Sequence, residues 1–268
     1  MQLATSIHNL SEFFLLFSKD LILMPVIFLG LIFFERRFIP PALLLLLVMI
    51  LCPLLKFFFA IPYPPELVQK LGKEGFSFPS GHMLSASVFY GWFLLTTNIN
   101  KLLRFGLIFI IFGIGFGLIY EGYHNIYDVN GAVFFAFIVI ALYRFIISFG
   151  KKRIANLSDH LIGSSAVLAL SLCLSIALIL FYEIPSHSVM ALYSILGITM
   201  GLWSSGNLEK YNIKLIYLIM IVIGFFGLAY LLSIIQFNVL FLQQLKWILL
   251  SFTFPILASI AKRLNWKK

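Results

Sequence analysis

Long runs of apolar residues, separated by short breaks that carry charged residues, Pro or Gly, fill most of the chain. A helix rises about 1.5 Å per residue, so roughly 20 apolar residues cross a hydrocarbon core about 30 Å thick. The pattern therefore predicts an all-α protein, a polytopic transmembrane bundle of about nine helices. The predicted spans are 21–35, 41–61, 80–97, 102–121, 128–149, 160–182, 188–204, 213–235 and 241–261.

Residues 1–20 differ from these runs because polar and charged residues interrupt them. They carry His8, Glu12, Lys19 and Asp20, and they have neither a basic start nor a small-residue cleavage site of the kind found in signal peptides. We expect a short helix across 3–17 that lies in the membrane interface.

The composition strengthens the membrane prediction. Hydrophobic residues make up 62% of the 268 residues and charged residues only 11%, and a soluble domain of this length cannot hide so much apolar surface. The net charge of +9 is spread in short clusters between apolar runs, which is typical of topology signals and not of a nucleic-acid-binding surface. Cys52 and Cys173 both fall inside apolar runs, so we expect neither a disulfide framework nor a Cys-based metal site.

The positions of Lys and Arg predict the topology. With nine crossings, one face receives 14 of the 19 basic residues, and the positive-inside rule makes this face cytoplasmic. These residues are Arg36, Arg37, Lys101, Arg104, Arg144, Lys151, Lys152, Arg153, Lys210, Lys214, Lys262, Arg263, Lys267 and Lys268. The outer face then carries the longest polar loop, 61–78, and the turn 120–128.

A basic and polar segment, 151–159, separates the first five predicted helices from the last four. We therefore expect three parts: the interfacial helix at 1–20, a helical core at 21–150, and a C-terminal four-helix membrane region at 151–268.

The motif Pro79-Ser80-Gly81-His82 opens the third apolar run. Ser is a good N-cap, and a helix N-terminus presents free backbone N–H groups and partial positive charge, which suit a phosphate. Gly81 lets a ligand approach the backbone closely, and His82 is suited to give a proton to a leaving oxygen. An ordinary capped helix with an interfacial His is the competing interpretation.

A second motif, His124-Asn125-Ile126-Tyr127-Asp128, follows about forty residues later. On a helical turn residues four apart are neighbours, so the Asp128 carboxylate can hold the His124 ring and leave its other nitrogen free to attack. Asp128 can equally serve as an N-cap of the fifth predicted span. Lys56 lies near the outer end of the second span, so all these residues fall on one membrane face.

Together these residues resemble the type-2 phosphatidic acid phosphatase superfamily, which includes lipid phosphate phosphatases and glucose-6-phosphatase, over roughly 40–150. The resemblance implies that His124 is the nucleophile that forms a phosphohistidine, that Asp128 orients it and that His82 is the general acid. It also implies that Lys56, Ser80 and Gly81 hold phosphate oxygens.

Two motifs depart from the family pattern. Tyr63 stands where the family's first motif has Arg, and Gly117-Leu118 stands where its third motif has Ser-Arg. All six arginines fall on the predicted cytoplasmic side, so in the outer loop Lys70 and Lys73 are, with Lys56, the remaining cations. Lysine lacks the bidentate geometry of arginine. Glu121, three residues before His124, is easier to accommodate beside a monoanion than a dianion.

Three functions remain open at this stage. The first is a lipid phosphatase or phosphotransferase that cleaves a lipid phosphoester at the outer face. The second is a phosphodiester headgroup transferase similar to sphingomyelin synthase, and the third is a non-catalytic lipid-headgroup binding or transport protein. No cofactor or metal is expected, since no Cys/His cluster or carboxylate pair is present. We expect a bacterial inner-membrane protein with its site on the periplasmic face, a lipid phosphate or phospholipid as its substrate, and no nucleic-acid partner.

Overall fold

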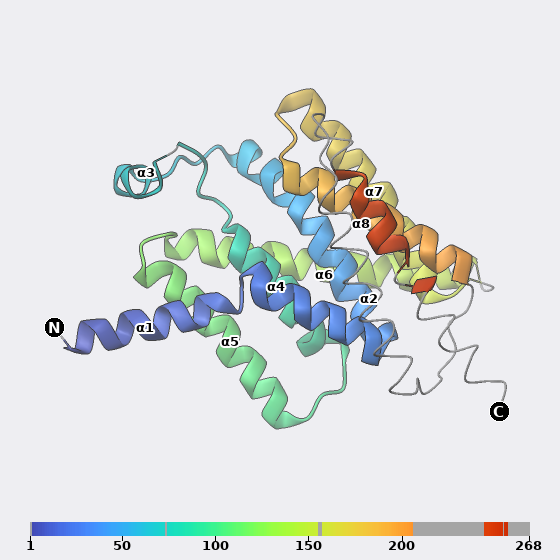
Figure 1. The fold of residues 1–268 in the computed structure, drawn as a ribbon, viewed down its shortest axis with the longest axis horizontal. Coiled ribbons are helices and arrows are strands. Elements are labelled where there is room, and N and C mark those ends of the chain that lie inside the picture. Colours follow the sequence, from blue (N-terminus) through green and yellow to red (C-terminus); the bar gives the residue numbers. More distant parts are fainter. Residues whose placement is uncertain (1, 73, 155–156, 206–243, 254, 257–268) are drawn as a thin grey trace. The chain divides into compact units, whose positions relative to one another are not determined.

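The structure is a computed structural model that describes residues 2–72, 74–154, 157–205, 244–253 and 255–256. The chain divides into two compact units, Met1–Arg144 and Phe145–Lys268. The first unit holds α1 to α5 and most of α6, and the second holds the end of α6 with α7 and α8 (Figure 1). The helices are α1 Gln2–Leu16, α2 Asp20–Phe59, α3 Pro65–Leu71, α4 Gly81–Thr96, α5 Lys101–Tyr120, α6 Ile126–Arg153, α7 Asp159–Phe181 and α8 Ser186–Ser205.

Five of the described helices are long and apolar enough to cross a membrane. The described residues are mostly helical and contain no strand beyond an isolated bridge, which confirms the predicted all-α polytopic bundle. The candidate spans are Arg37–Phe59, Lys101–Tyr120, Ile126–Arg153, Asp159–Phe181 and Ser186–Ser205. The chain is an integral membrane protein.

The remaining predicted spans have different outcomes. The span 80–97 is observed as α4, whose 16 residues make it shorter than the five candidate spans. The span 213–235 lies outside the described residues, and 241–261 is described only at 244–253 and 255–256. The total of nine crossings therefore stays a prediction.

The predicted spans 21–35 and 41–61 form a single helix, α2, which corrects the prediction of two separate helices. This helix is bent, and Figure 1 shows its two arms running in different directions. A Cβ added at Gly30 would meet the ring of Phe38, although eight residues of straight helix span about 12 Å. Pro40 and Pro41 lie beside the bend, where each removes a backbone donor and crowds the preceding turn.

In the first unit α4 packs against α2 and α5, and α1 packs along α5. The ring of Phe14 lies against Gly113, and a Cβ added at Gly117 would come within 2.9 Å of the Ser11 carbonyl oxygen. Small residues four apart let two membrane helices approach closely. The N-terminal segment is thus helical and packs on α5, and its predicted place in the membrane interface stays a prediction.

Side-chain caps begin α4, α5 and α7. The Ser80 hydroxyl accepts from a backbone N–H at the start of α4, Asn100 does so for α5 and Ser158 for α7. Each cap satisfies one of the donors that the first turn of a helix leaves unpaired. The Ser80 cap decides where the motif Pro79-Ser80-Gly81-His82 stops being loop and becomes helix.

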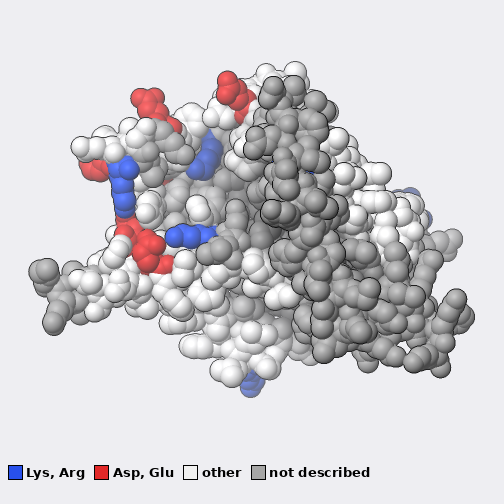
Figure 2. Space-filling model, viewed as in Figure 1, with Lys and Arg blue, Asp and Glu red and all other residues white. Residues whose placement is uncertain are grey.

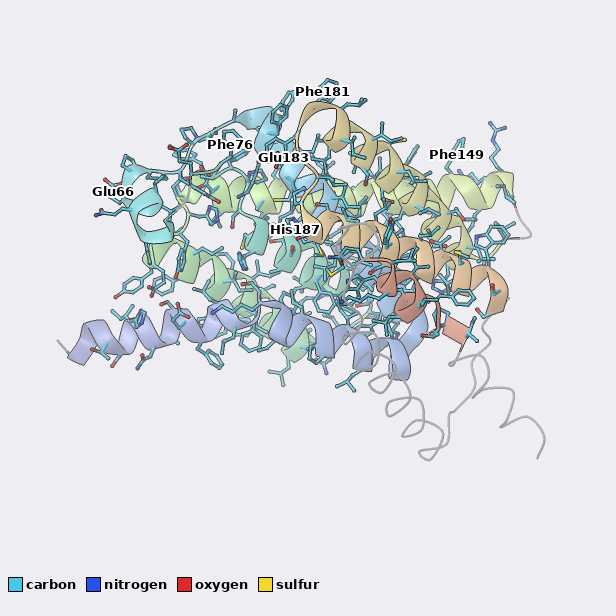
Figure 3. The ribbon with its side chains drawn as sticks, turned by 45° about the horizontal axis from the view of Figure 1, so that its top comes forward. Glu66, Phe76, Phe149, Phe181, Glu183 and His187 are labelled. Carbon is cyan, nitrogen blue, oxygen red and sulfur yellow. The ribbon has the colours of Figure 1, made fainter. Side chains whose placement is uncertain are left out.

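In the second unit α7 packs against α8. Thr199 on α8 donates to the carbonyl of Ser164 on α7 at 3.3 Å, and Trp203 donates to the Ser165 hydroxyl at 3.1 Å. Hydroxyl groups of this kind join membrane helices, where apolar burial alone does not favour contact between them. Figure 3 shows Glu183 and His187 near the connection between the two helices.

Candidate active site

The loop between α2 and α4 is folded back on itself. Ser77 N donates to the Ile61 carbonyl at 2.8 Å and Tyr63 N donates to that of Gly75 at 2.9 Å, with α3 between the two paired segments. Figure 3 shows Glu66 on α3 and Phe76 on the segment that returns from it. This backbone pairing brings the residues before Pro79 next to the end of α2.

Lys56, on the last turn of α2, joins this loop. Its ammonium donates to the carbonyl of Phe76 at 2.8 Å and lies 5.5 Å from the centre of the Tyr63 ring. An ammonium has three donors, so the contact with Phe76 leaves donor capacity for an anion. The Lys56 amine is only part-buried.

The motif Pro79-Ser80-Gly81-His82 starts α4. Ser80 is fully buried, and its hydroxyl accepts from Met83 N at 3.5 Å. His82 lies in the first turn of the helix and is exposed. The motif therefore presents a helix N-terminus with an accessible imidazole beside it.

His124 lies in the turn between α5 and α6, next to Asp128 on the first turn of α6. Its Nδ1 is 3.2 Å from Oδ2 of Asp128. Asn125 caps α6 reciprocally, since its side chain accepts from Asp128 N at 2.9 Å while Asp128 accepts from Asn125 N at 3.2 Å. An ionised Asp128 accepts from Nδ1–H, and in the neutral imidazole this arrangement leaves the lone pair on Nε2.

Asp128 connects the two motifs. Its side chain is 2% exposed and accepts a hydrogen bond from the Ser77 hydroxyl at 3.3 Å. Its carbonyl accepts from Ser80 N at 3.2 Å. One buried carboxylate residue thus holds His124 on one side and the loop that leads to His82 on the other.

Lys70 on α3 approaches the turn that carries His124. Its ammonium donates to the Glu121 carbonyl at 2.9 Å and lies 4.2 Å from the centre of the Tyr123 ring. Figure 2 shows acidic and basic side chains gathered over α3 and beside it. Lys73, the other predicted loop cation, lies outside the described residues.

Glu121 turns toward α1. Its carboxylate lies 2.8 Å from Nδ1 of His8 and accepts a hydrogen bond from the Ser11 hydroxyl. The Ser11 hydrogen bond, together with His8 and the charge of Lys70, lowers the pKa of Glu121 against the opposing effect of burial. Glu121 is therefore ionised at neutral pH, and its charge is engaged by α1.

The positions that hold arginine in the resembled family are occupied differently here. Tyr63 lies beside Lys56, Leu118 is buried at 3% exposure, and Gly117 packs against α1. The carbonyl of Leu118 accepts from the N–H groups of Tyr123 and His124. Position 118 therefore supports the turn by its backbone and offers no charge.

Three residues that contact the site were not predicted from the sequence to belong to it. Ser77 and Ser11 form side-chain contacts with Asp128 and Glu121, and His8 contacts Glu121 across 113 positions. By contrast, the reciprocal cap of Asn125 and Asp128 has a local signal in the sequence. Asn three residues before Asp at the start of an apolar run is typical of a helix start. Contacts between residues more than fifty positions apart have no such signal.

The fold and these contacts define a class of protein: an integral membrane protein with a histidine–aspartate pair where the ends of α2, α4, α5 and α6 meet. Residues 37–153 match the family model of the PAP2 superfamily, which confirms the resemblance to the type-2 phosphatidic acid phosphatases. The matched segment contains Lys56, both motifs and the whole of α6. No curated protein and no solved structure matches the chain.

The match supports phosphatase-type activity on phosphoesters. Within the part of the chain that the structure describes, no group of three His, Cys, Asp or Glu side chains is arranged to hold a metal ion.

Proposed function

We propose that this protein is a membrane-embedded lipid phosphatase or phosphotransferase that cleaves a lipid phosphoester at the outer membrane face through a phosphohistidine intermediate. The observation that carries the proposal is the 3.2 Å contact between His124 and the buried Asp128. A carboxylate on Nδ1 directs the free Nε2 toward a substrate and stabilises the imidazolium that forms during transfer.

The reaction has two steps in this proposal. In the first, Nε2 of His124 attacks phosphorus, the bond from phosphorus to the lipid oxygen breaks, and His82 gives its proton to the departing alkoxide. In the second, His82 takes a proton from a water molecule or an acceptor alcohol, whose oxygen attacks the phosphohistidine and frees His124. Water gives inorganic phosphate, and an alcohol gives a transferred phosphoester.

The remaining groups of the site would hold phosphate oxygens. Ser80 and Gly81 start α4, whose free N–H groups and positive end favour an anion. Lys56 and Lys70 already contact the two segments that carry the motifs, and each ammonium has unused donors for a phosphate. We keep Lys73 as a further candidate from the same loop.

A lipid substrate is supported by the apolar surroundings. Phe58 at the end of α2 and Tyr127 beside Asp128 are each 77% exposed, and α2, α5 and α6, whose ends meet at the site, contain segments long and apolar enough to span a membrane. Exposed aromatic residues at a helix end suit the boundary between headgroups and acyl chains. A phosphate bound at the ends of these helices would lie where a phospholipid has its headgroup.

Diester headgroup transfer, as in the sphingomyelin synthases, is the second candidate. It is favoured by the replacement of both family arginines by Tyr63 and the buried Leu118. A dianionic monoester depends strongly on charge stabilisation in its transition state, whereas a diester carries about one negative charge at neutral pH. Lys56 and Lys70 match the smaller charge better.

The test uses the purified full-length protein with phosphatidic acid, a polyprenyl phosphate and a pair of labelled phospholipids. Release of inorganic phosphate supports the phosphatase, and headgroup exchange without free phosphate supports the transferase. His124→Ala should abolish either activity, and His187→Ala, a histidine outside the matched segment, should retain it. If His124→Ala leaves every activity intact, the phosphohistidine mechanism is wrong.

A further inference from the structure

Glu121 receives contacts from two elements that precede the catalytic motifs in the chain. From α1, His8 and Ser11 contact its carboxylate, and from α3, Lys70 donates to its carbonyl. We call His8, Ser11, Lys70 and Glu121 the Glu121 clamp. Glu121 ends α5, so the clamp acts on the point where the chain leaves that helix.

The turn from Glu121 to His124 is short and tightly bonded. Gly122 N donates to the Ile119 carbonyl at 3.1 Å, and the N–H groups of Tyr123 and His124 both donate to the Leu118 carbonyl, at 3.0 and 3.1 Å. Gly122 has a φ of +71°, a conformation that glycine adopts without strain. Because the segment has little slack, a displacement of Glu121 is passed on to His124.

We infer that the Glu121 clamp positions His124 for attack, so that the N-terminal helix α1 is part of the catalytic apparatus. This inference rests on the proposed function. Glu121 is a positioning residue in it, since its carboxylate contacts His8 and Ser11 on α1 and acts on His124 through the turn. A nucleophile must lie within about 3–3.5 Å of the atom it attacks, and a misplacement of about 1 Å can cost about a hundredfold in rate.

The clamp also explains how an acidic residue is accommodated three positions before the nucleophile. Its charge is directed to the Ser11 hydroxyl and the His8 ring, and Lys70 donates to the backbone carbonyl of the same residue. Were Glu121 to face the substrate, removing its charge would relieve repulsion and lower KM. The positioning role predicts a lower kcat at nearly constant KM.

The test compares Glu121→Ala and Ser11→Ala with Glu12→Ala in the full-length protein. Glu12 is a matched control, since it is the neighbour of Ser11 on α1 and its exposed carboxylate pairs with Lys19 instead of α5. We expect kcat to fall roughly ten- to hundredfold in Glu121→Ala, less in Ser11→Ala, and to be unchanged in Glu12→Ala. Glu121→Gln keeps an acceptor for Ser11 and should recover part of the loss.

Amide hydrogen exchange of the peptide that contains Tyr123 and His124 supplies a readout independent of activity. The positioning role predicts faster exchange there in Glu121→Ala and Ser11→Ala, and wild-type exchange in Glu12→Ala. Unchanged exchange in both clamp variants would overturn the inference, and so would faster exchange with an unaltered kcat. A wild-type protein that is inactive on every phosphoester would refute the proposed function, while the exchange result would still show whether the Glu121 clamp holds the turn. If Glu121→Ala does not fold, Ser11→Ala tests the inference by itself.

Discussion

At the scale of single residues, Asp128 connects the two motifs of the site. It holds the His124 ring, caps α6 together with Asn125, and accepts from Ser77 and from the backbone of Ser80. A buried carboxylate is stable only when its oxygens are paired, and here the pairing also orients the groups proposed to react. The Asp128 side chain therefore serves both the local structure and the proposed reaction.

Replacing Asp128 by Asn should lower kcat by about a hundredfold or more, because a neutral amide does not stabilise an imidazolium and its NH2 group can donate to Nδ1, which favours the wrong tautomer. The measurement is the initial rate of phosphate release or headgroup transfer. Asn130→Ala, an exposed position on the same turn of α6, should keep the wild-type rate. Equal rates in Asp128→Asn and wild type would exclude the orienting role.

Glu121 predicts a pH dependence of stability. Its pKa in the folded protein is lowered from the ordinary 4.5, first by the Ser11 hydrogen bond and then by His8 and Lys70. A lowered folded-state pKa means that ionised Glu121 stabilises the fold above about pH 4.5, and that this contribution is lost as the pH falls through the lowered value. Thermal unfolding should therefore separate wild type from Glu121→Gln at neutral pH and bring the two together in acid. A constant difference from pH 7 down to pH 3 would contradict this assignment.

At the scale of the elements, close packing of α1 on α5 gives the N-terminal segment its place. The contact depends on Gly113 and Gly117, which leave room for Phe14 and for the backbone at Ser11. The contact continues to the end of α5, where Ser11 and His8 meet Glu121. The packing of α1 on α5 is thus connected, through Glu121, to the turn that carries His124.

Gly117→Ala should destabilise the protein by about 1–3 kcal/mol, because the added methyl group meets the carbonyl oxygen of Ser11, which a side-chain rotation cannot move away. Gly106→Ala is the matched control on α5, since an added Cβ there meets nothing within 4 Å. That control should be neutral or slightly stabilising, by up to about 1 kcal/mol, because Ala favours the helix. Thermal unfolding in detergent gives both values, and equal midpoints for the two variants would argue against the tight α1–α5 contact.

At the scale of the whole molecule, the basic residues predict which membrane face carries the site. The loop with α3 falls on the face poor in Lys and Arg, and the end of α6 carries Lys151, Lys152 and Arg153. The positive-inside rule therefore predicts that α3 lies on the outer face of the membrane and the end of α6 on the cytoplasmic face. The proposed substrate would be a lipid of the outer leaflet.

A membrane-impermeant maleimide tests this orientation in intact cells. In a Cys173→Ser background, which removes the exposed native thiol, Glu66→Cys on α3 should be labelled from outside. Lys152→Cys should be labelled only after the membrane is permeabilised. The opposite pattern would place the site on the cytoplasmic face.

The helices α5 to α8 could be predicted from the sequence because a helix needs only its own apolar run and its own backbone bonds. The contact between His124 and Asp128 is equally local, since four positions equal about one helical turn. The bend of α2 was predicted as a break between two helices. Pro40 and Pro41 indicate that the regular helix is interrupted, but not whether it ends or bends there.

The sequence by itself determined the class of fold, the apolar helices and the residue types available for phosphoester chemistry. The tertiary structure alone decided that Ser77 supports Asp128, that Lys70 contacts the turn before His124, and that α1 holds Glu121. Each of these contacts joins residues more than fifty positions apart, and such pairs are set by how the helices pack and by where small residues let them approach. The spacing of residues along the chain does not indicate which helices pack against one another.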